Sequence, residues 1–203
     1  MFAWLMRGMA ARYDRALGDR KRDLLGSLQG TLLEIGPGTG SSLAYLPPEL
    51  DWIGLEPNVA MHGPLLRTAQ RLGRTVDLRR GFAHDTGLPD RSVDAVFSSL
   101  VLCSVRDLSQ TLQELRRVLR PGGRLIVLEH VAAPGGTWLR RVQGWSRPAW
   151  RRLFDNCHPD RETGEAIAAA GFEEIAFETI AGPVPIPVIR PHLLGVARKP
   201  LDA

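Results

Sequence analysis

Short apolar runs alternate along the chain with longer segments in which apolar residues recur at helical spacing. The run at residues 30–36 (GTLLEIG) is apolar and ends at a glycine, which indicates a buried strand. The run at 92–102 is almost continuously apolar, as is typical of a central parallel strand. The same pattern predicts seven strands, at residues 30–36, 51–57, 75–81, 92–102, 124–131, 173–180 and 192–200.

Helical segments separate most of these strands. Leucines recur on one face of residues 107–119, and a Pro-Gly-Gly sequence at 121–123 ends this helix. The other predicted helices cover residues 2–27, with a break near Gly18, 39–46, 58–73 and 160–172, the last capped near Asp160. This order predicts an α/β doubly wound, mostly parallel seven-stranded sheet. Because no helix separates the last two strands, we expect them to form an antiparallel terminal hairpin.

The length of 203 residues suits a single domain spanning residues 1–203. No apolar run approaches the roughly 18 residues of a membrane span, and the N-terminus has no secretory signal pattern. Two cysteines, Cys103 and Cys157, show no metal-ligand spacing, so we expect no metal and interpret both as packed small residues. A reduced, cytoplasmic setting fits this cysteine usage best.

The chain carries a formal net charge of +4, almost all of it from arginine. A basic chain can bind nucleic acid or a membrane surface. Here the arginines are spread along the chain and no DNA- or RNA-binding motif accompanies them. We therefore expect no nucleic-acid partner and interpret most of the charge as solvated surface.

A glycine loop follows the first predicted strand. Gly36, Gly38 and Gly40 occupy the first strand-to-helix turn, where open parallel sheets bind ligands. Glycine there allows unusual backbone angles and close approach of a ligand. A lone glycine loop leaves NAD, FAD or another adenosine cofactor open. The spacing G-x-G-x-G, which differs from the G-x-G-x-x-G of dinucleotide loops, narrows this choice.

Two acidic residues accompany this loop. Glu56 ends the second strand, where a carboxylate can accept both hydroxyls of a ribose, an argument that serves any adenosine cofactor. The alternative interpretation of Glu56 is a surface carboxylate that follows a strand. Glu34 precedes the loop. It is a candidate cofactor contact, and the alternative interpretation is that it organises loop amides without touching the ligand.

At these motifs the sequence resembles class I S-adenosylmethionine-dependent methyltransferases of type 11, which have a Rossmann-like fold. The resemblance covers residues 31–130 and includes LEIGPGTG, IGLEPN, GFAHDTGLPDRSVDAV and ELRRVLRPGGRLIVLEH. It implies S-adenosylmethionine as cofactor, with the methionine part along the glycine loop and the ribose on Glu56. The implied contacts are Tyr13, Glu34, Gly36, Gly38, Gly40, Glu56, Pro57, Ala83, His84 and Ser99. Many relatives carry an acid at the position of His84, and the neighbouring Asp85 is an alternative contact for adenine.

A closer resemblance covers residues 93–199. The segments SSLVLCSV, LEHVAAPGGTWLRRVQ, PAWRRLFDNCHPDRETGEAI and IRPHLLGVARK are similar to membrane-associated methyltransferase-like proteins that methylate alkyl thiols, and to their soluble bacterial relatives. The long hydrophobic N-terminal anchor of the membrane-bound members has no counterpart here. The resemblance implies a small thiol as methyl acceptor, attacked at the methyl carbon by in-line displacement.

Such a displacement needs positioning more than acid–base help, because a thiolate is already a good nucleophile. The candidate catalytic groups are Glu129 and His130, at the carboxyl end of the fifth strand, and Asp155. The alternative interpretation of these residues is structural: Glu129 or His130 could hold the following loop in place, and Asp155 could cap a helix.

Two segments are expected to cover the crevice. Residues 1–27 form an N-terminal helical cover that carries Tyr13, and the Trp/Arg-rich residues 135–158 form a substrate-side lid or a weak membrane-surface contact. The alternative interpretation of residues 135–158 is a helix packed on the sheet with solvated arginines.

Three other functions remain open at this point: methylation of an oxygen, nitrogen or carbon of a small apolar acceptor, cofactor binding without catalysis, and binding to a lipid surface. The oligomeric state is not predicted.

Overall fold

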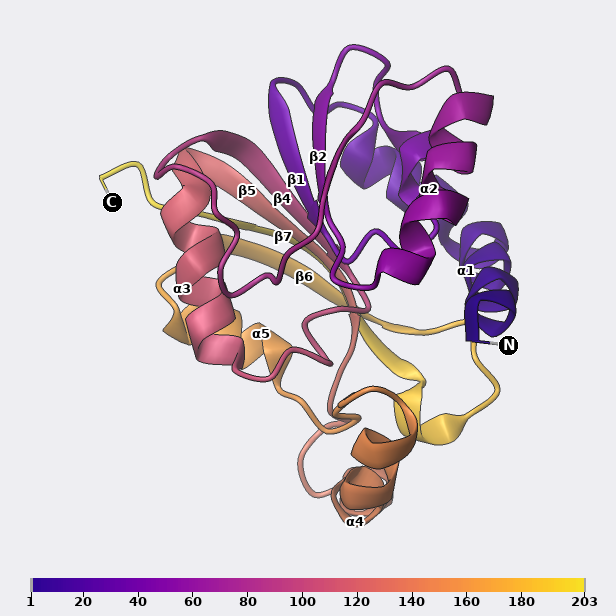
Figure 1. Cartoon of the computed structure of the whole chain (residues 1–203). Helices are drawn as coiled ribbons and strands as arrows, with labels where there is room; N and C mark the ends of the chain where they lie inside the picture. Colours follow the sequence, from indigo (N-terminus) through magenta and orange to yellow (C-terminus); the bar gives the residue numbers. More distant parts are fainter. Residues whose placement is uncertain (1, 203) are drawn as a thin grey trace.

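The seven predicted strands form one sheet in the order β3-β2-β1-β4-β5-β7-β6 (Figure 1). The computed structural model describes residues 2–202, so Met1 and Ala203 lie outside the described part of the predicted domain. The strands are β1 (Thr31–Ile35), β2 (Asp51–Leu55), β3 (Asp77–Arg79), β4 (Val93–Ser99), β5 (Leu119–His130), β6 (Glu173–Ala181) and β7 (Pro191–Arg198). β1 to β5 run parallel, and β7 runs antiparallel to both β5 and β6. The predicted fold class is confirmed.

The helices cover both faces of this sheet. They are α1 (Phe2–Leu25), α2 (Val59–Arg71), α3 (Leu108–Val118), α4 (Trp138–Leu153) and α5 (Thr163–Ala169), with 3-10 helices η1 (Ser41–Tyr45) and η2 (Pro187–Ile189). α1 and α2 lie on one face of the sheet and α3 and α5 on the other, while α4 projects beyond the sheet (Figure 1). Side-chain caps fix three starts, since Asn58, Asp107 and Thr137 accept backbone N–H groups of α2, α3 and α4.

Strand alternation divides the core between the two faces. Leu33 and Ile35 of β1 pack in the cluster below α3 and α5, and Leu32 packs in the cluster below α1 and α2. β4 repeats this pattern, with Val96 on the first side and Phe97 on the second. Both clusters contain residues with no exposed surface, which is why these strands appear in the sequence as apolar runs.

Several predicted details are wrong. Instead of the α-helix predicted over 39–46, a short 3-10 helix covers Ser41–Tyr45, preceded by Gly40 with a left-handed angle (φ 76°). α1 continues through Gly18 without a break. Asp160 does not cap α5, whose N-cap is Glu162 without a side-chain hydrogen bond. The Pro-Gly-Gly sequence predicted to end α3 lies within β5, because α3 already ends at Val118.

The sheet order reverses beside β1, which has β2 on one side and β4 on the other. Ligands of open α/β sheets bind outside the carboxyl ends of the strands at such a point. The glycine loop leaves β1 there, the loop after β4 begins at Leu100, and β5 ends at His130. Among residues 2–202, no helix has the length and apolar character that crossing a bilayer requires.

Candidate active site

The glycine loop has the left-handed backbone that its composition predicts. Gly36, Gly38 and Gly40 have φ values of 57°, 56° and 76°. A Cβ on Gly36 would lie 2.5 Å from the Val101 side chain, so the loop packs against the segment that follows β4. A Cβ on Gly38 would meet no atom of the protein within 4 Å. The centre of the loop therefore faces open space, where a ligand can approach the backbone closely.

Glu56 connects the end of β2 to this loop. One carboxylate oxygen accepts the Gly38 N–H at 2.9 Å, and the other accepts the Asn58 N–H at 2.8 Å. Only 6 % of the residue is exposed. Each carboxylate oxygen can accept two hydrogen bonds, so one acceptor position per oxygen remains for a ribose hydroxyl. Glu56 thus combines the predicted ligand geometry with a structural role that the sequence pattern did not indicate.

Glu34 lies below the loop and binds side chains, not the loop amides. The Ser42 hydroxyl is 2.6 Å from both carboxylate oxygens, and the Trp52 indole N–H donates to one of them at 2.8 Å. Burial raises the pKa of Glu34 against the effect of these hydrogen bonds. These contacts support the start of η1, and a direct contact with the cofactor stays a prediction.

The predicted adenine side lies after β3. The His84 ring stacks on the exposed Phe82 ring with a centroid distance of 5.5 Å, and Ala83 is half-buried between them. Thr86 ties this segment to α3, because both its backbone N–H and its hydroxyl donate to the Glu114 carboxylate. Pro57, after β2, and Ser99, at the end of β4, are half-buried at the carboxyl ends of their strands.

Glu129 anchors the loop after β4. Its buried carboxylate accepts the Ser98 hydroxyl at 2.6 Å, and it also accepts the backbone N–H groups of residues 101, 102 and 103. Burial raises the pKa of Glu129, and these hydrogen bonds oppose that rise. The contacts match the structural alternative for this residue, whereas a part in catalysis stays a prediction.

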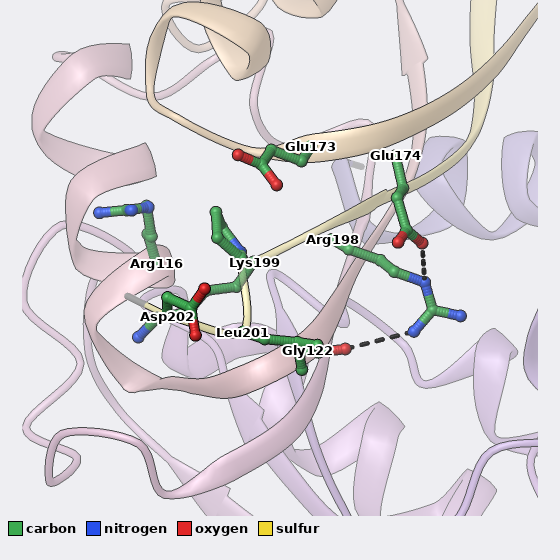
Figure 2. Close-up of a pocket in the computed structure, with 9 residues that line it drawn as sticks. Arg116, Gly122, Glu173, Glu174, Arg198, Lys199, Leu201 and Asp202 are labelled. Carbon is green, nitrogen blue, oxygen red and sulfur yellow. Dashed lines mark hydrogen bonds and ion pairs between the residues drawn. The ribbon is translucent and has the colours of Figure 1, made fainter.

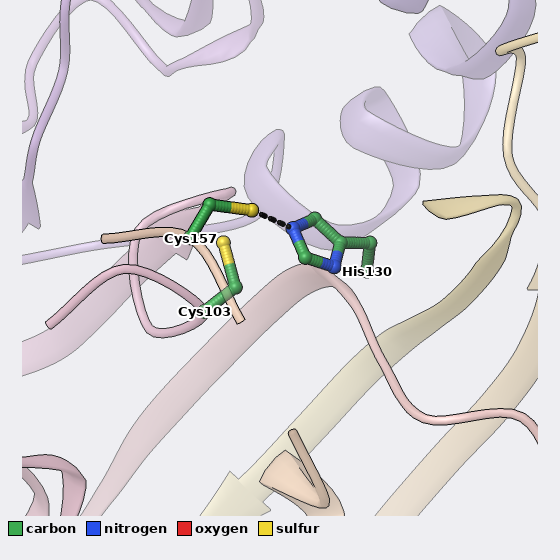
Figure 3. Close-up of side chains that lie close together, drawn as sticks. All are labelled: Cys103, His130 and Cys157. Carbon is green, nitrogen blue, oxygen red and sulfur yellow. Dashed lines mark hydrogen bonds between the residues drawn. The ribbon is translucent and has the colours of Figure 1, made fainter. Parts of the chain in front are cut away.

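His130 ends β5 beside two cysteines (Figure 3). His130 Nε2 is 3.0 Å from the Cys157 sulfur, and the ligand atoms of Cys103, His130 and Cys157 all lie within 4.8 Å of one another. A hydrogen bond with Cys103, and then the His130 imidazole, lower the pKa of Cys157, whereas the pKa of Cys103 is raised. The Trp150 indole N–H also donates to the Cys157 sulfur at 3.2 Å. Both cysteines are buried, as their interpretation as packed residues predicts, and they also belong to a polar cluster that the sequence did not indicate.

Tyr13 contributes from α1 to the same region. Its hydroxyl is 2.6 Å from His192 Nε2, and His192 Nδ1 is 3.0 Å from the Arg190 carbonyl oxygen. Since a carbonyl only accepts, Nδ1 is the donor and Nε2 accepts the tyrosine proton. Burial lowers the pKa of His192 to about 4, which keeps this ring neutral. The ring lies 6.3 Å from the His130 ring between centroids, so Tyr13 reaches the cluster through His192.

The predicted lid is held over the carboxyl end of β5 by one buried amide. Gln143 of α4 donates to the Val131 and Val188 carbonyl oxygens and accepts the Ala133 N–H. Its side chain has no exposed surface. This anchor places Trp150 and the turn after α4 beside the cysteine–histidine cluster.

Asp155 does not join this cluster. It is exposed, in a left-handed turn (φ 47°) directly after α4. The next residue, Asn156, donates instead to the Ser104 carbonyl oxygen at 2.9 Å. Sequence reasoning missed Cys103, Cys157 and His192 as parts of the site. Cys103 and Cys157 lie next to polar residues that follow a strand and the lid, which was an available signal, whereas His192 lies inside β7 between Pro191 and Leu193 and had no such signal.

A second hollow lies at the opposite end of the sheet (Figure 2). It measures about 610 Å³ and has mixed charge, with Arg116, Glu173 and Lys199 in its lining. Gly122, near the start of β5, also lines it, whereas the glycine loop follows the end of the parallel strand β1. This hollow is therefore separate from the site described above.

The fold and the loop geometry agree with known methyltransferases. A family model described as a methyltransferase domain matches residues 33–127. The structure of geranyl diphosphate methyltransferase in complex with SAM superimposes with a TM-score of 0.74 at 20 % identity, covering 91 % of this chain and 84 % of that one. The [4+2]-cyclase SpnF gives the same TM-score at 20 % identity, covering 92 % of this chain and 80 % of that one, so likeness of fold alone does not define the reaction.

Sequence identity with curated proteins extends over nearly the whole chain. The chain is 35 % identical over 200 residues to thiol S-methyltransferase TMT1A of Homo sapiens, covering 92 % of this chain and 81 % of that protein. It is also 35 % identical to thiol S-methyltransferase TMT1B of Homo sapiens, covering 98 % of this chain and 86 % of that protein. The chain therefore belongs to the S-adenosylmethionine-dependent methyltransferase family.

Proposed function

We propose that this enzyme transfers the methyl group of S-adenosylmethionine to the sulfur of a small or apolar thiol. The observation that carries the proposal is the 35 % identity with two thiol S-methyltransferases. The matches cover 92 % and 98 % of the chain, so they include the lid and much of the cysteine–histidine cluster and not only the cofactor-binding half.

The cofactor side of this proposal rests on the glycine loop and Glu56. The open space at Gly38 accepts the methionine part of the cofactor, and the free acceptor positions of Glu56 accept the two ribose hydroxyls. The residues 82–86 border the adenine. The cofactor methyl then points toward the ends of β4 and β5, where the loop after β4 already contacts Gly36.

The reaction is a single displacement. An electron pair on the acceptor sulfur forms the new S–CH₃ bond, and the C–S⁺ bond of the cofactor breaks with its electron pair on the departing sulfur. The products are a thioether and S-adenosylhomocysteine, and the thiol proton goes to solvent. Enclosure by α4 and α1 excludes water, which would otherwise compete for the acceptor position.

The test is a paired assay with one carbon skeleton that carries SH, OH or NH₂. Labelled methyl transfer is measured for each acceptor at equal concentration. We expect the thiol to react fastest, because an alcohol has a much higher pKa and needs an effective base. Faster transfer to the alcohol or amine would reject the thiol and leave methylation of oxygen or nitrogen. Cofactor binding without transfer to any acceptor would favour a binding module.

We also propose that α4 touches anionic membrane surfaces weakly. Trp138 and Trp145 are 67 % and 87 % exposed, and Arg141 and Arg152 follow at helical spacing on the same face. Gln143, the buried anchor, lies on the opposite face. Exposed tryptophan beside arginine suits the interface of an anionic bilayer.

Co-sedimentation with vesicles of neutral or anionic lipid tests this contact. We expect binding to anionic vesicles that weakens in salt and falls several-fold in Trp145→Ser. Leu66→Ser removes an apolar side chain that is 50 % exposed on α2, away from α4, and should bind as the unmodified chain does. Equal binding of all three proteins would exclude α4 as the membrane-facing segment. A cytoplasmic location is proposed with it, supported by two neighbouring cysteines that are both free.

A further inference from the structure

Three side chains that bind soft metal ions converge beside the proposed cofactor crevice (Figure 3). Cys103 lies in the loop after β4, His130 ends β5, and Cys157 follows α4. All three residues are at most 9 % exposed. Two thiolates and one imidazole form a ligand set that favours Zn²⁺ over the hard cations Mg²⁺ and Ca²⁺.

The spacing of the three ligand atoms suits one ion. With Zn–S bonds of about 2.3 Å and Zn–N bonds of about 2.0 Å, a tetrahedral site places its sulfur atoms about 3.8 Å apart and sulfur and nitrogen about 3.5 Å apart. In the structure His130 Nε2 is 3.0 Å from Cys157 Sγ, and every pair lies within 4.8 Å. The separation between His130 and Cys157 is shorter than the tetrahedral value and the others do not exceed 4.8 Å, so side-chain rotations can bring all three atoms onto the metal.

The two segments that carry the cysteines are held together by hydrogen bonds outside the cluster. The backbone N–H of His158 donates to the Cys103 carbonyl oxygen at 2.9 Å, and the side-chain amide of Asn156 donates to the Ser104 carbonyl oxygen at 2.9 Å. The Glu129 carboxylate accepts the Cys103 N–H from below. The backbone at both cysteines is therefore fixed before any ion binds, which favours a built site over a chance approach of side chains.

Three protein ligands leave one position of a tetrahedral zinc ion for an exogenous ligand. The loop that carries Cys103 also contains Val101, whose side chain packs against Gly36 of the glycine loop. The cluster thus lies beside the crevice in which the cofactor is proposed to bind, where an acceptor must meet the methyl group.

We propose that Cys103, His130 and Cys157 bind one Zn²⁺ and that its fourth ligand is the sulfur of the acceptor thiol. This inference rests on the proposed thiol methylation and adds the means of activation. Zinc binds the acceptor as a thiolate and releases its proton to solvent, because a coordinating thiol is deprotonated. A sulfur electron pair then forms the bond to the cofactor methyl, and the neutral thioether, a weaker ligand, leaves the metal.

Metal binding is measured first, without reference to activity. The full chain, purified under reducing conditions, is titrated with Zn²⁺ against a chromogenic chelator. We expect one tight site per chain, with affinity reduced more than 100-fold in Cys103→Ser, His130→Ala and Cys157→Ser, since even outer-shell changes cost ten- to hundred-fold. His62→Asn, on α2 away from the cluster, should bind zinc as the unmodified chain does. No tight site in the unmodified chain, or unchanged affinity in the three variants, would overturn the proposal.

Cobalt then tests the role of the fourth ligand. The chain loaded with Co²⁺ should show thiolate-to-cobalt absorption, and a thiol acceptor should change its visible spectrum while the matching alcohol does not. A spectrum unaffected by the thiol would overturn the acceptor role. If metal-free protein methylates the thiol at full rate, the proposed role of zinc in the reaction is rejected and the proposed function still stands. A cobalt spectrum that changes without methyl transfer would support the metal site and reject the proposed reaction.

Discussion

At the scale of single residues, we expect Glu56 to combine loop structure with cofactor recognition. Its carboxylate holds the Gly38 and Asn58 amides, and its remaining acceptor positions suit a ribose. Hydrogen bonds to a charged group contribute roughly 1.5–3 kcal/mol each. We therefore expect Glu56→Ala to weaken S-adenosylmethionine binding at least about tenfold, measured by calorimetry. Glu49→Ala, at an exposed position, is the matched control and should bind normally. Equal affinity of both variants would remove Glu56 from the site.

Gly38 offers a sharper comparison, because Gly73 has the same backbone geometry outside the site. Both have φ near 60° (56° and 64°), and a Cβ on either meets no protein atom within 4 Å. Valine at either position incurs the strain of a left-handed angle. Only at Gly38 should the side chain also occupy the cofactor's place. We expect similar losses of melting temperature in Gly38→Val and Gly73→Val, with cofactor binding abolished in the first alone. Normal cofactor binding by Gly38→Val would show that the ligand does not approach this loop.

At the scale of elements, α3 holds the segment after β3 through Glu114. The Arg117 guanidinium, and then Thr86, lower the pKa of Glu114 from its ordinary value of 4.5 to about 2. A carboxyl with a lowered pKa in the folded state stabilises the fold above the unfolded value, and this contribution is lost as pH falls from about 4.5 through about 2.

Glu114→Gln should therefore be less stable than the unmodified chain at neutral pH, and the difference should shrink as pH falls from about 4.5 toward 2. Urea unfolding across this range measures it. The exposed Glu165→Gln on α5 provides the control, with a small difference at every pH. A constant difference for Glu114→Gln over the whole range would contradict the ion-pair explanation.

The strands could be predicted from the sequence because burial on both faces leaves continuous apolar runs. The glycine loop could be predicted because its backbone angles favour glycine at three positions. η1 could not be predicted from the sequence, because the left-handed angle of Gly40 and the hydrogen bond between Ser42 and Glu34 depend on the packed loop. The anchoring of α4 could not be predicted, because its one buried side chain is a glutamine, Gln143, whose hydrogen-bond partners lie after β5 and in η2.

At the scale of the whole molecule, sheet order determines which residues meet. Cys103, His130 and Cys157 are far apart in the sequence, and no local spacing predicts a common site. They meet because β4 and β5 are neighbours and because the left-handed turn at Asp155 and Asn156 returns the chain from α4 to the end of β4. The loop proposed to bind the cofactor is thus local in the sequence and predictable, whereas the cluster proposed to bind the acceptor depends on topology.

The most direct test of the whole account is a crystal structure of the chain with S-adenosylhomocysteine and a thiol acceptor. We predict ribose hydroxyls on Glu56, the homocysteine part along Gly36 to Gly40, and the acceptor sulfur beside Cys103, His130 and Cys157. The acceptor sulfur should lie about 3 Å from the position of the transferred methyl carbon. A nucleoside bound away from Glu56, or an acceptor sulfur on the far side of the cofactor from the cluster, would contradict the account.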